Sequence, residues 1–108
     1  MYEYQLTIGL FDKDTEKQEI GTQDAKNIIK EIIVDNNNLM CTLFACEGCY
    51  RMNSTGRVVS EPSIRVEIAY NTNIDDMIDG IAHTLAMYLN QESVMVKKCG
   101  LSRFDFIG

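Results

Sequence analysis

Apolar and polar residues alternate strictly at the start of the chain. Between residues 2 and 10 every even position is apolar, and these positions are Tyr2, Tyr4, Leu6, Ile8 and Leu10. A period of two places all of these side chains on one face of a β-strand. The pattern therefore predicts a first strand with one buried face.

A different period governs two other stretches. Apolar residues recur every three or four positions across residues 74–89 and, in a shorter stripe, across residues 25–33. That spacing places them on one side of an α-helix. Both stretches are predicted to be helices that bury one face, and residues 74–89 carry the clearer pattern.

Residues 39–52, 57–70 and 94–99 are predicted to be strands. The first does not alternate cleanly, which indicates burial on both faces or a bulge near Gly48. Residues 53–56 are typical of a hairpin turn. Pro62 lacks an amide donor, so the strand over 57–70 is expected to be interrupted at residues 61–63, where Pro62 would mark an edge, a bend or a bulge. The tail, 101–108, is expected to add a short strand or to pack across a sheet edge.

The predicted element order is β-α-β-β-α-β. Two helices with one apolar stripe each must share one face of an antiparallel sheet. The predicted fold class is therefore α+β, in the ferredoxin-like arrangement with two helices on one face of the sheet. At 108 residues, the whole chain (1–108) is expected to form a single domain.

The net charge of the chain indicates which kinds of partner it is suited to bind. Sixteen acidic residues against ten basic ones give a net charge of −6. Phosphate backbones are bound by clustered Lys and Arg, so direct nucleic-acid binding is disfavoured. A protein partner with a basic surface is compatible with this charge. The charge is equally compatible with a role in solubility alone.

The sequence shows no pattern of a membrane or secretory protein. No apolar run approaches the ~20 residues that span a bilayer, and the first residues lack the basic and apolar regions of a signal peptide. We therefore expect a cytoplasmic protein with no membrane partner. In that compartment its four cysteines are expected to be reduced.

The pair Cys46 and Cys49 has the spacing of a metal-binding knuckle. Together with Cys41 and either Cys99 or His83 it would supply four zinc ligands. Structural zinc sites usually combine two such knuckles, however, and the second is missing here. Free thiols in strands are the favoured interpretation, and Cys46 and Cys49 stay weak metal candidates.

No catalytic motif stands out in the chain. His83 is the only imidazole, so a cysteine nucleophile with a histidine base would depend on one helical residue. The glycines near the middle of the chain are isolated and do not form a phosphate-binding loop. We therefore predict no cofactor and assign no catalytic residue, and whether the protein is an enzyme stays open.

Four consecutive polar residues, 90–93, separate the clearest helix from the last strand. One interpretation is a simple helix exit. The other is that they face a pocket at the end of the sheet, where charge-assisted hydrogen bonds would orient a ligand or a partner. The candidate partner- or ligand-binding residues are Gln91, Glu92, Ser93, Glu61, Ser63 and Arg65.

Short motifs across residues 39–96 add to this picture: Gly48-x-Tyr50, Gly56, Glu61-x-Ser63 and Leu89-x-Gln91-Glu92-Ser93-Val94. They resemble a family of short bacterial and phage domains with a ferredoxin-like fold and no assigned biochemical function. Some members are secreted lipoproteins, whereas this chain resembles the unsecreted members from Firmicutes and their phages. The resemblance implies the fold and a shared role for the Gln-Glu-Ser segment, and it implies no activity.

Three functions follow as hypotheses. The first is a small acidic, non-catalytic interaction protein, such as a phage or mobile-element inhibitor of a CRISPR-type host defence nuclease. The second is a domain that binds a small molecule or a nucleotide, in which a homodimer would enclose the pocket. The third is an enzyme of unrecognised type, which would need Glu92 or His83. Small size, net charge −6 and the missing catalytic motif favour the first.

Overall fold

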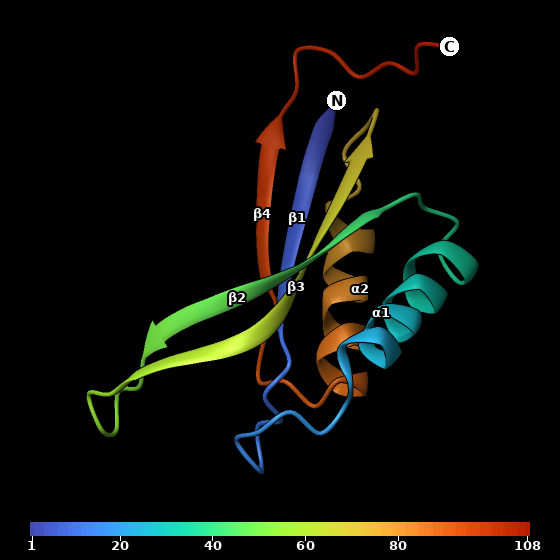
Figure 1. The fold of residues 1–108 in the computed structure, drawn as a ribbon. Coiled ribbons are helices and arrows are strands. Elements are labelled where there is room, and N and C mark those ends of the chain that lie inside the picture. The colour runs from blue at the N-terminus through green and yellow to red at the C-terminus, as the bar shows by residue number, and fades with distance from the viewer.

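The computed structural model describes all residues from Met1 to Gly108. Its elements follow the order that the sequence predicts, with a π-helical turn, η1, added to the end of the first helix (Figure 1). The elements are β1 (Tyr2–Gly9), α1 (Thr22–Lys30), η1 (Glu31–Asp35), β2 (Thr42–Arg51), β3 (Val58–Tyr70), α2 (Asp75–Tyr88) and β4 (Met95–Gly100).

The four strands form one antiparallel sheet in the order β2-β3-β1-β4. Figure 1 shows α1 and α2 on the same side of this sheet, and the β2–β3 hairpin extending as an arm beyond the helices. The predicted α+β class, with an antiparallel sheet and two helices, is confirmed. No helix is long and apolar enough to cross a membrane.

The core lies between the sheet and the helices. Leu6 and Ile8 of β1 are fully buried, as are Ile29 of α1 and both Ile78 and Leu85 of α2. Burying an aliphatic side chain of this size stabilises a fold by roughly 1.5–3 kcal/mol. The alternation along β1 therefore leaves Thr7 and Gly9 on the opposite face of the sheet, which the helices do not cover.

Strand β3 is continuous, so the predicted interruption at residues 61–63 is wrong. Pro62 pairs in register with Glu47 of β2, while its carbonyl accepts a hydrogen bond from the Leu10 amide at 2.9 Å. The nitrogen and carbonyl of one strand residue point to the same side, so the missing donor of Pro62 faces β1. The last pair of the ladder between β1 and β3 is Gly9 with Ser63, so at Pro62 this ladder has already ended and no bond is lost. The proline ends one ladder and leaves the other intact.

One alternative of each of two further predictions is wrong, namely the bulge near Gly48 and the short strand in the tail. The ladder between β2 and β3 pairs every residue from Thr42 to Arg51 one to one, so β2 has no bulge at Gly48. Residues 101–108 form no strand, although the Leu101 amide donates to the Met1 carbonyl at 2.9 Å. Alternation in so short a tail does not supply enough backbone partners to extend the sheet.

A buried tyrosine ties β1 to the start of α2. The Tyr4 hydroxyl donates to the Asp75 carboxylate at 2.8 Å and accepts from the Ile74 amide at 3.0 Å. Lys98 of β4 forms an ion pair with Asp75 at 2.9 Å. The network satisfies an otherwise free amide at the helix N-terminus, where a carboxylate also complements the helix dipole.

This network predicts a loss of stability in acid. The Lys98 ammonium, followed by the Tyr4 hydroxyl, lowers the pKa of Asp75 below its ordinary value. A carboxylate whose pKa is lower in the folded state stabilises the fold above its unfolded pKa, and that contribution is lost as the pH falls through the folded pKa. Unfolding free energies measured from pH 7 to pH 2 for the wild type and Asp75→Asn should converge at the acidic end. A constant difference across that range would contradict this assignment.

Candidate functional site

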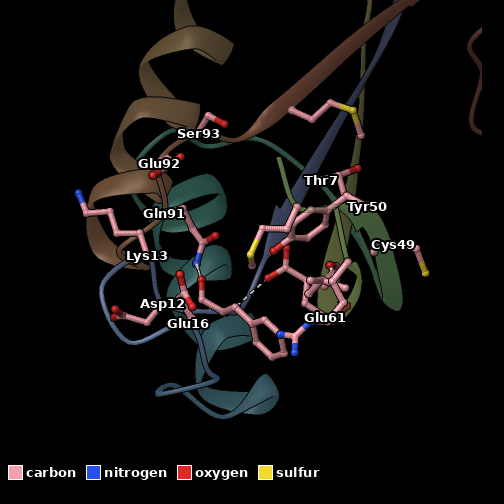
Figure 2. A pocket seen from close by; sticks show the side chains of 18 of the residues that line it. Thr7, Asp12, Lys13, Glu16, Cys49, Tyr50, Glu61, Gln91, Glu92 and Ser93 are labelled. Atoms are coloured by element: carbon pink, nitrogen blue, oxygen red, sulfur yellow. Dashed lines mark hydrogen bonds between the residues drawn. The ribbon is translucent and has the colours of Figure 1, made fainter. Parts of the chain in front are cut away.

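A cavity of about 580 Å³ lies at one end of the sheet, on the face opposite the helices. Its floor is formed by residues of β1 and β3, one wall by the β2–β3 arm, and the other by the loop after β1 together with the turn between α2 and β4 (Figure 2). Three segments that are distant in the sequence, residues 7–16, 48–63 and 91–95, thus meet at one place.

Glu61 is held at the centre of the floor by backbone atoms. The Phe11 amide donates to its carboxylate at 2.9 Å, which is dashed in Figure 2. Gly9 makes the approach feasible, because a Cβ atom there would lie 2.4 Å from the Glu61 carboxylate oxygen. The Leu10 amide still donates to the Pro62 carbonyl at 2.9 Å, and the Phe11 amide, two residues after the end of β1, is the first that binds a side chain instead. The local sequence thereby fixes one carboxylate in the cavity.

The same close packing occurs on β2. A Cβ atom at Gly48 would lie 2.9 Å from the Ser63 hydroxyl, and Ser63 is the one buried polar residue, on the sheet face opposite the core. Its hydroxyl donates to the Glu61 carbonyl at 3.3 Å. Small residues at these positions let the polar side chains of β3 lie flat on the sheet.

The turn after α2 closes the cavity from the other side. Asn90 adopts a left-handed backbone with φ of 49°, which short polar side chains tolerate. Its side-chain amide donates to the carboxylates of Asp12 and Asp14, each at 2.9 Å. Gln91 donates to the Phe11 carbonyl at 2.8 Å. The turn and the loop after β1 are therefore joined by side chains of two consecutive residues.

The cavity is acidic and partly aromatic. Its carboxylates outnumber its cations, and the ring of Tyr50 stands beside Glu61 (Figure 2). Burial, followed by the nearby Glu61, Glu16 and Glu92 carboxylates, raises the pKa of Tyr50 above its ordinary value. A carboxylate beside an aromatic ring favours a cationic ligand group. The two cations in the lining are Lys13 and Arg57.

The structure brings most of the predicted site residues together. Gln91, Glu92 and Ser93 line the cavity opposite Glu61 and Ser63 (Figure 2).

Arg65 does not line the cavity. Its guanidinium lies over the Phe44 ring at 4.5 Å, and its Nε lies 3.6 Å from the Glu67 carboxylate. Arg65 shares a face with Ser63 but is two residues further from the end of the sheet, where Phe44 covers it. Its register partner Thr7 does line the cavity, so the direction of the Arg65 side chain, over Phe44 and toward Glu67, keeps it outside.

The weak metal candidates are not assembled into a cluster. Cys46 and Cys49 are three residues apart in β2, so their side chains point to opposite faces of the sheet. All four cysteines are free thiols, and no three His, Cys, Asp or Glu side chains gather as metal ligands. His83 is exposed on α2 and does not line the cavity.

Several lining residues could not be assigned from the sequence. Phe11, Lys13 and Glu16 belong to a charged loop, and Tyr50 and Arg57 to the hairpin arm. Their position depends on how far that arm extends past β1. Gly9 could have been recognised from the sequence, since a glycine in an otherwise regular strand often marks the close approach of another group.

No family model matches the sequence, and no curated protein matches it. Among solved structures, the fold is similar to phage SAM lyase in complex with S-methyl-5′-thioadenosine, with TM-score 0.65, 19% identity, and coverage of 91% of this chain and 79% of that chain. A DUF3240 family protein from Shewanella baltica gives TM-score 0.56 and 9% identity over 99% of this chain and 97% of that one.

The divalent ion tolerance protein CutA1 from Ehrlichia chaffeensis gives TM-score 0.54 and 8% identity over 95% of this chain and 84% of that one. At these identities the similarities show a shared fold: a small α+β domain with a four-stranded antiparallel sheet and two helices.

The Gly9→Ala substitution should displace the Glu61 carboxylate. The new methyl group would occupy the place of that carboxylate, and the hydrogen bond from Phe11 would be lost. A hydrogen bond to a charged group contributes about 1.5–3 kcal/mol, while replacing a strand glycine by alanine returns about 0.5–1 kcal/mol. Chemical denaturation should therefore show a net loss of about 1–2 kcal/mol.

The matched control is Gly80→Ala. A Cβ atom there meets nothing within 4 Å, and in a helix interior alanine should stabilise the fold by about 1 kcal/mol. If Gly9→Ala is as stable as Gly80→Ala, the described contact between Gly9 and Glu61 is wrong.

Proposed function

We propose that the cavity binds S-adenosylmethionine and that the protein cleaves it as a lyase. The observation that carries this proposal is the Glu61 carboxylate, fixed by the Phe11 amide at 2.9 Å beside the Tyr50 ring in an acidic cavity. The similarity of the fold to phage SAM lyase supports the choice of ligand. This proposal joins the second and third hypotheses drawn from the sequence.

The ligand suits the lining chemically. S-adenosylmethionine carries a sulfonium and an ammonium group, and the sulfonium has no proton to donate. Such a cation is recognised by carboxylates and by aromatic faces rather than by hydrogen bonds. Glu61, Glu92 and the Tyr50 ring supply these groups, and Lys13 and Arg57 are the cations available for the carboxylate of the ligand. The volume of about 580 Å³ is in the ordinary range of small-molecule sites.

The proposed reaction needs neither a nucleophile nor a proton donor from the protein. The carboxylate of the substrate attacks its own γ-carbon, the bond from that carbon to sulfur breaks, and the electron pair stays on sulfur. The products are a lactone and S-methyl-5′-thioadenosine, and the neutral thioether leaves without needing a proton. Opposite charges cancel in this step, so it is favoured where water is excluded and the reacting groups are held in line. The reaction is therefore compatible with a site in which the sequence shows no motif for a catalytic nucleophile.

A phage or mobile-element anti-defence role is part of the same proposal. Consumption of the methyl donor would deprive methyl-dependent host defence enzymes of their substrate. Inhibition of a defence nuclease through a protein partner with a basic surface stays a separate prediction, as does homodimer formation. We also propose the ferredoxin-like assignment, which the strand order β2-β3-β1-β4 supports.

Purified protein incubated with S-adenosylmethionine should release S-methyl-5′-thioadenosine, measured by liquid chromatography. Glu61→Gln should reduce the rate by roughly tenfold or more, because it removes the charge. The amide oxygen can still accept from Phe11, so the fold should be kept.

The control is Glu67→Gln, whose carboxylate pairs with Arg65 at 3.6 Å outside the cavity and whose substitution should leave the rate unchanged. If calorimetry detects binding of S-adenosylmethionine but no product forms, the proposed lyase activity is wrong and the proposed binding site stands. Neither binding nor product would remove the proposal altogether.

A further inference from the structure

The side chain of Gln91 has a fixed orientation. Its nitrogen donates to two carbonyl oxygens, Phe11 at 2.8 Å and Leu89 at 3.1 Å. A carbonyl accepts hydrogen bonds and cannot donate, so the nitrogen rather than the oxygen of the amide must occupy this position. Both amide protons are thereby used, and the amide cannot flip without facing two acceptors.

Phe11 is held on both sides of its own α-carbon. Its carbonyl accepts from Gln91 at 2.8 Å, and its amide donates to Glu61 at 2.9 Å. The preceding residue, Leu10, donates to the Pro62 carbonyl at 2.9 Å. One residue of the loop therefore connects the turn after α2 with the carboxylate on β3, as Figure 2 shows for Gln91 and Glu61.

The neighbouring contacts make this connection stiff. The Lys13 amide donates to the Asn90 carbonyl at 3.0 Å, and the Asn90 side chain binds Asp12. These contacts fix the loop after Phe11, whereas Gln91 is the side chain that fixes Phe11 itself from the helix side. The Gln91 oxygen takes no part in this arrangement and stays free to accept a hydrogen bond.

We propose that Gln91 is a positioning residue, which sets the place of the Glu61 carboxylate through the backbone of Phe11. The turn after α2 and the carboxylate on β3 then act as one unit, so Glu92 and Ser93 keep a constant distance from Glu61. The consequence for ligand binding rests on the proposed function. The mechanical connection rests on the hydrogen bonds alone and is tested without a ligand.

The test is hydrogen exchange of the Phe11 amide, measured by nuclear magnetic resonance on the protein without ligand. Gln91→Glu has nearly the same shape but no donor, and its carboxylate would face the Phe11 carbonyl. The Phe11 amide should exchange faster by roughly tenfold, while the Leu6 amide in the core of β1 keeps its rate. Ser93→Ala, in the same turn, should leave both rates unchanged.

Two outcomes would overturn the proposal. If the Phe11 amide keeps its rate in Gln91→Glu, Gln91 does not hold it. If the Phe11 and Leu6 amides accelerate equally, the substitution loosens the whole fold and Gln91 has no specific positioning role. Neither result depends on S-adenosylmethionine, so failure of this proposal is distinguishable from failure of the proposed function.

A second readout concerns the ligand. If Gln91 acts through Glu61, then Gln91→Glu and Glu61→Ala should weaken S-adenosylmethionine binding by similar factors, and the double variant should be little worse than either single variant. If the double variant instead weakens binding by the product of the two single-variant factors, Gln91 does not act through Glu61. The wild type serves as the reference for whether binding occurs at all.

Discussion

The cavity depends on the point at which β1 leaves the sheet, and Pro62 sets that point. The proline has no amide to donate toward β1, so the ladder stops after Gly9 and Ser63. After the Leu10 amide has donated to the Pro62 carbonyl, the amide of Phe11, two residues past the end of β1, binds the Glu61 side chain instead of a backbone carbonyl. The same residue that ends the ladder therefore leaves room for a loop to form a wall and for a carboxylate to be fixed beside it.

Stability and the candidate site are placed at opposite ends of α2. At the N-terminal end, Tyr4 and Lys98 hold Asp75, and this network joins the helix to both β1 and β4. At the C-terminal end, Asn90 and Gln91 hold the loop after β1. The apolar stripe between the two ends is buried and needs no functional explanation. A substitution at one end should therefore leave the chemistry of the other largely unchanged.

The periodicity of the sequence is sufficient to predict the class of fold, because β1, the second half of β3 and both helices each bury one face. By contrast, β2 and β4 have no buried residue. The periodicity also places Gln91, Glu92 and Ser93 opposite Glu61, because helix ends and strand ends meet at one edge of such a sheet. It fails at Pro62, because the missing donor of this proline faces β1 beyond the last β1–β3 pair, and β3 continues unbroken beside β2. It also fails for Phe11 and the arm residues, whose positions arise from tertiary geometry. Arg65 lies on the expected face, but its side chain is held over Phe44, outside the cavity.

The central claim is that the fixed Glu61 carboxylate and the turn after α2 form one ligand site. Chemical-shift mapping of the backbone amides during titration with S-adenosylmethionine tests it most directly. The amides of Phe11, Gly48, Glu61 and residues 91–93 should shift together and saturate at one ligand concentration, while those of α1 should not shift. An absence of shifts, or shifts confined to residues outside the cavity, would contradict it.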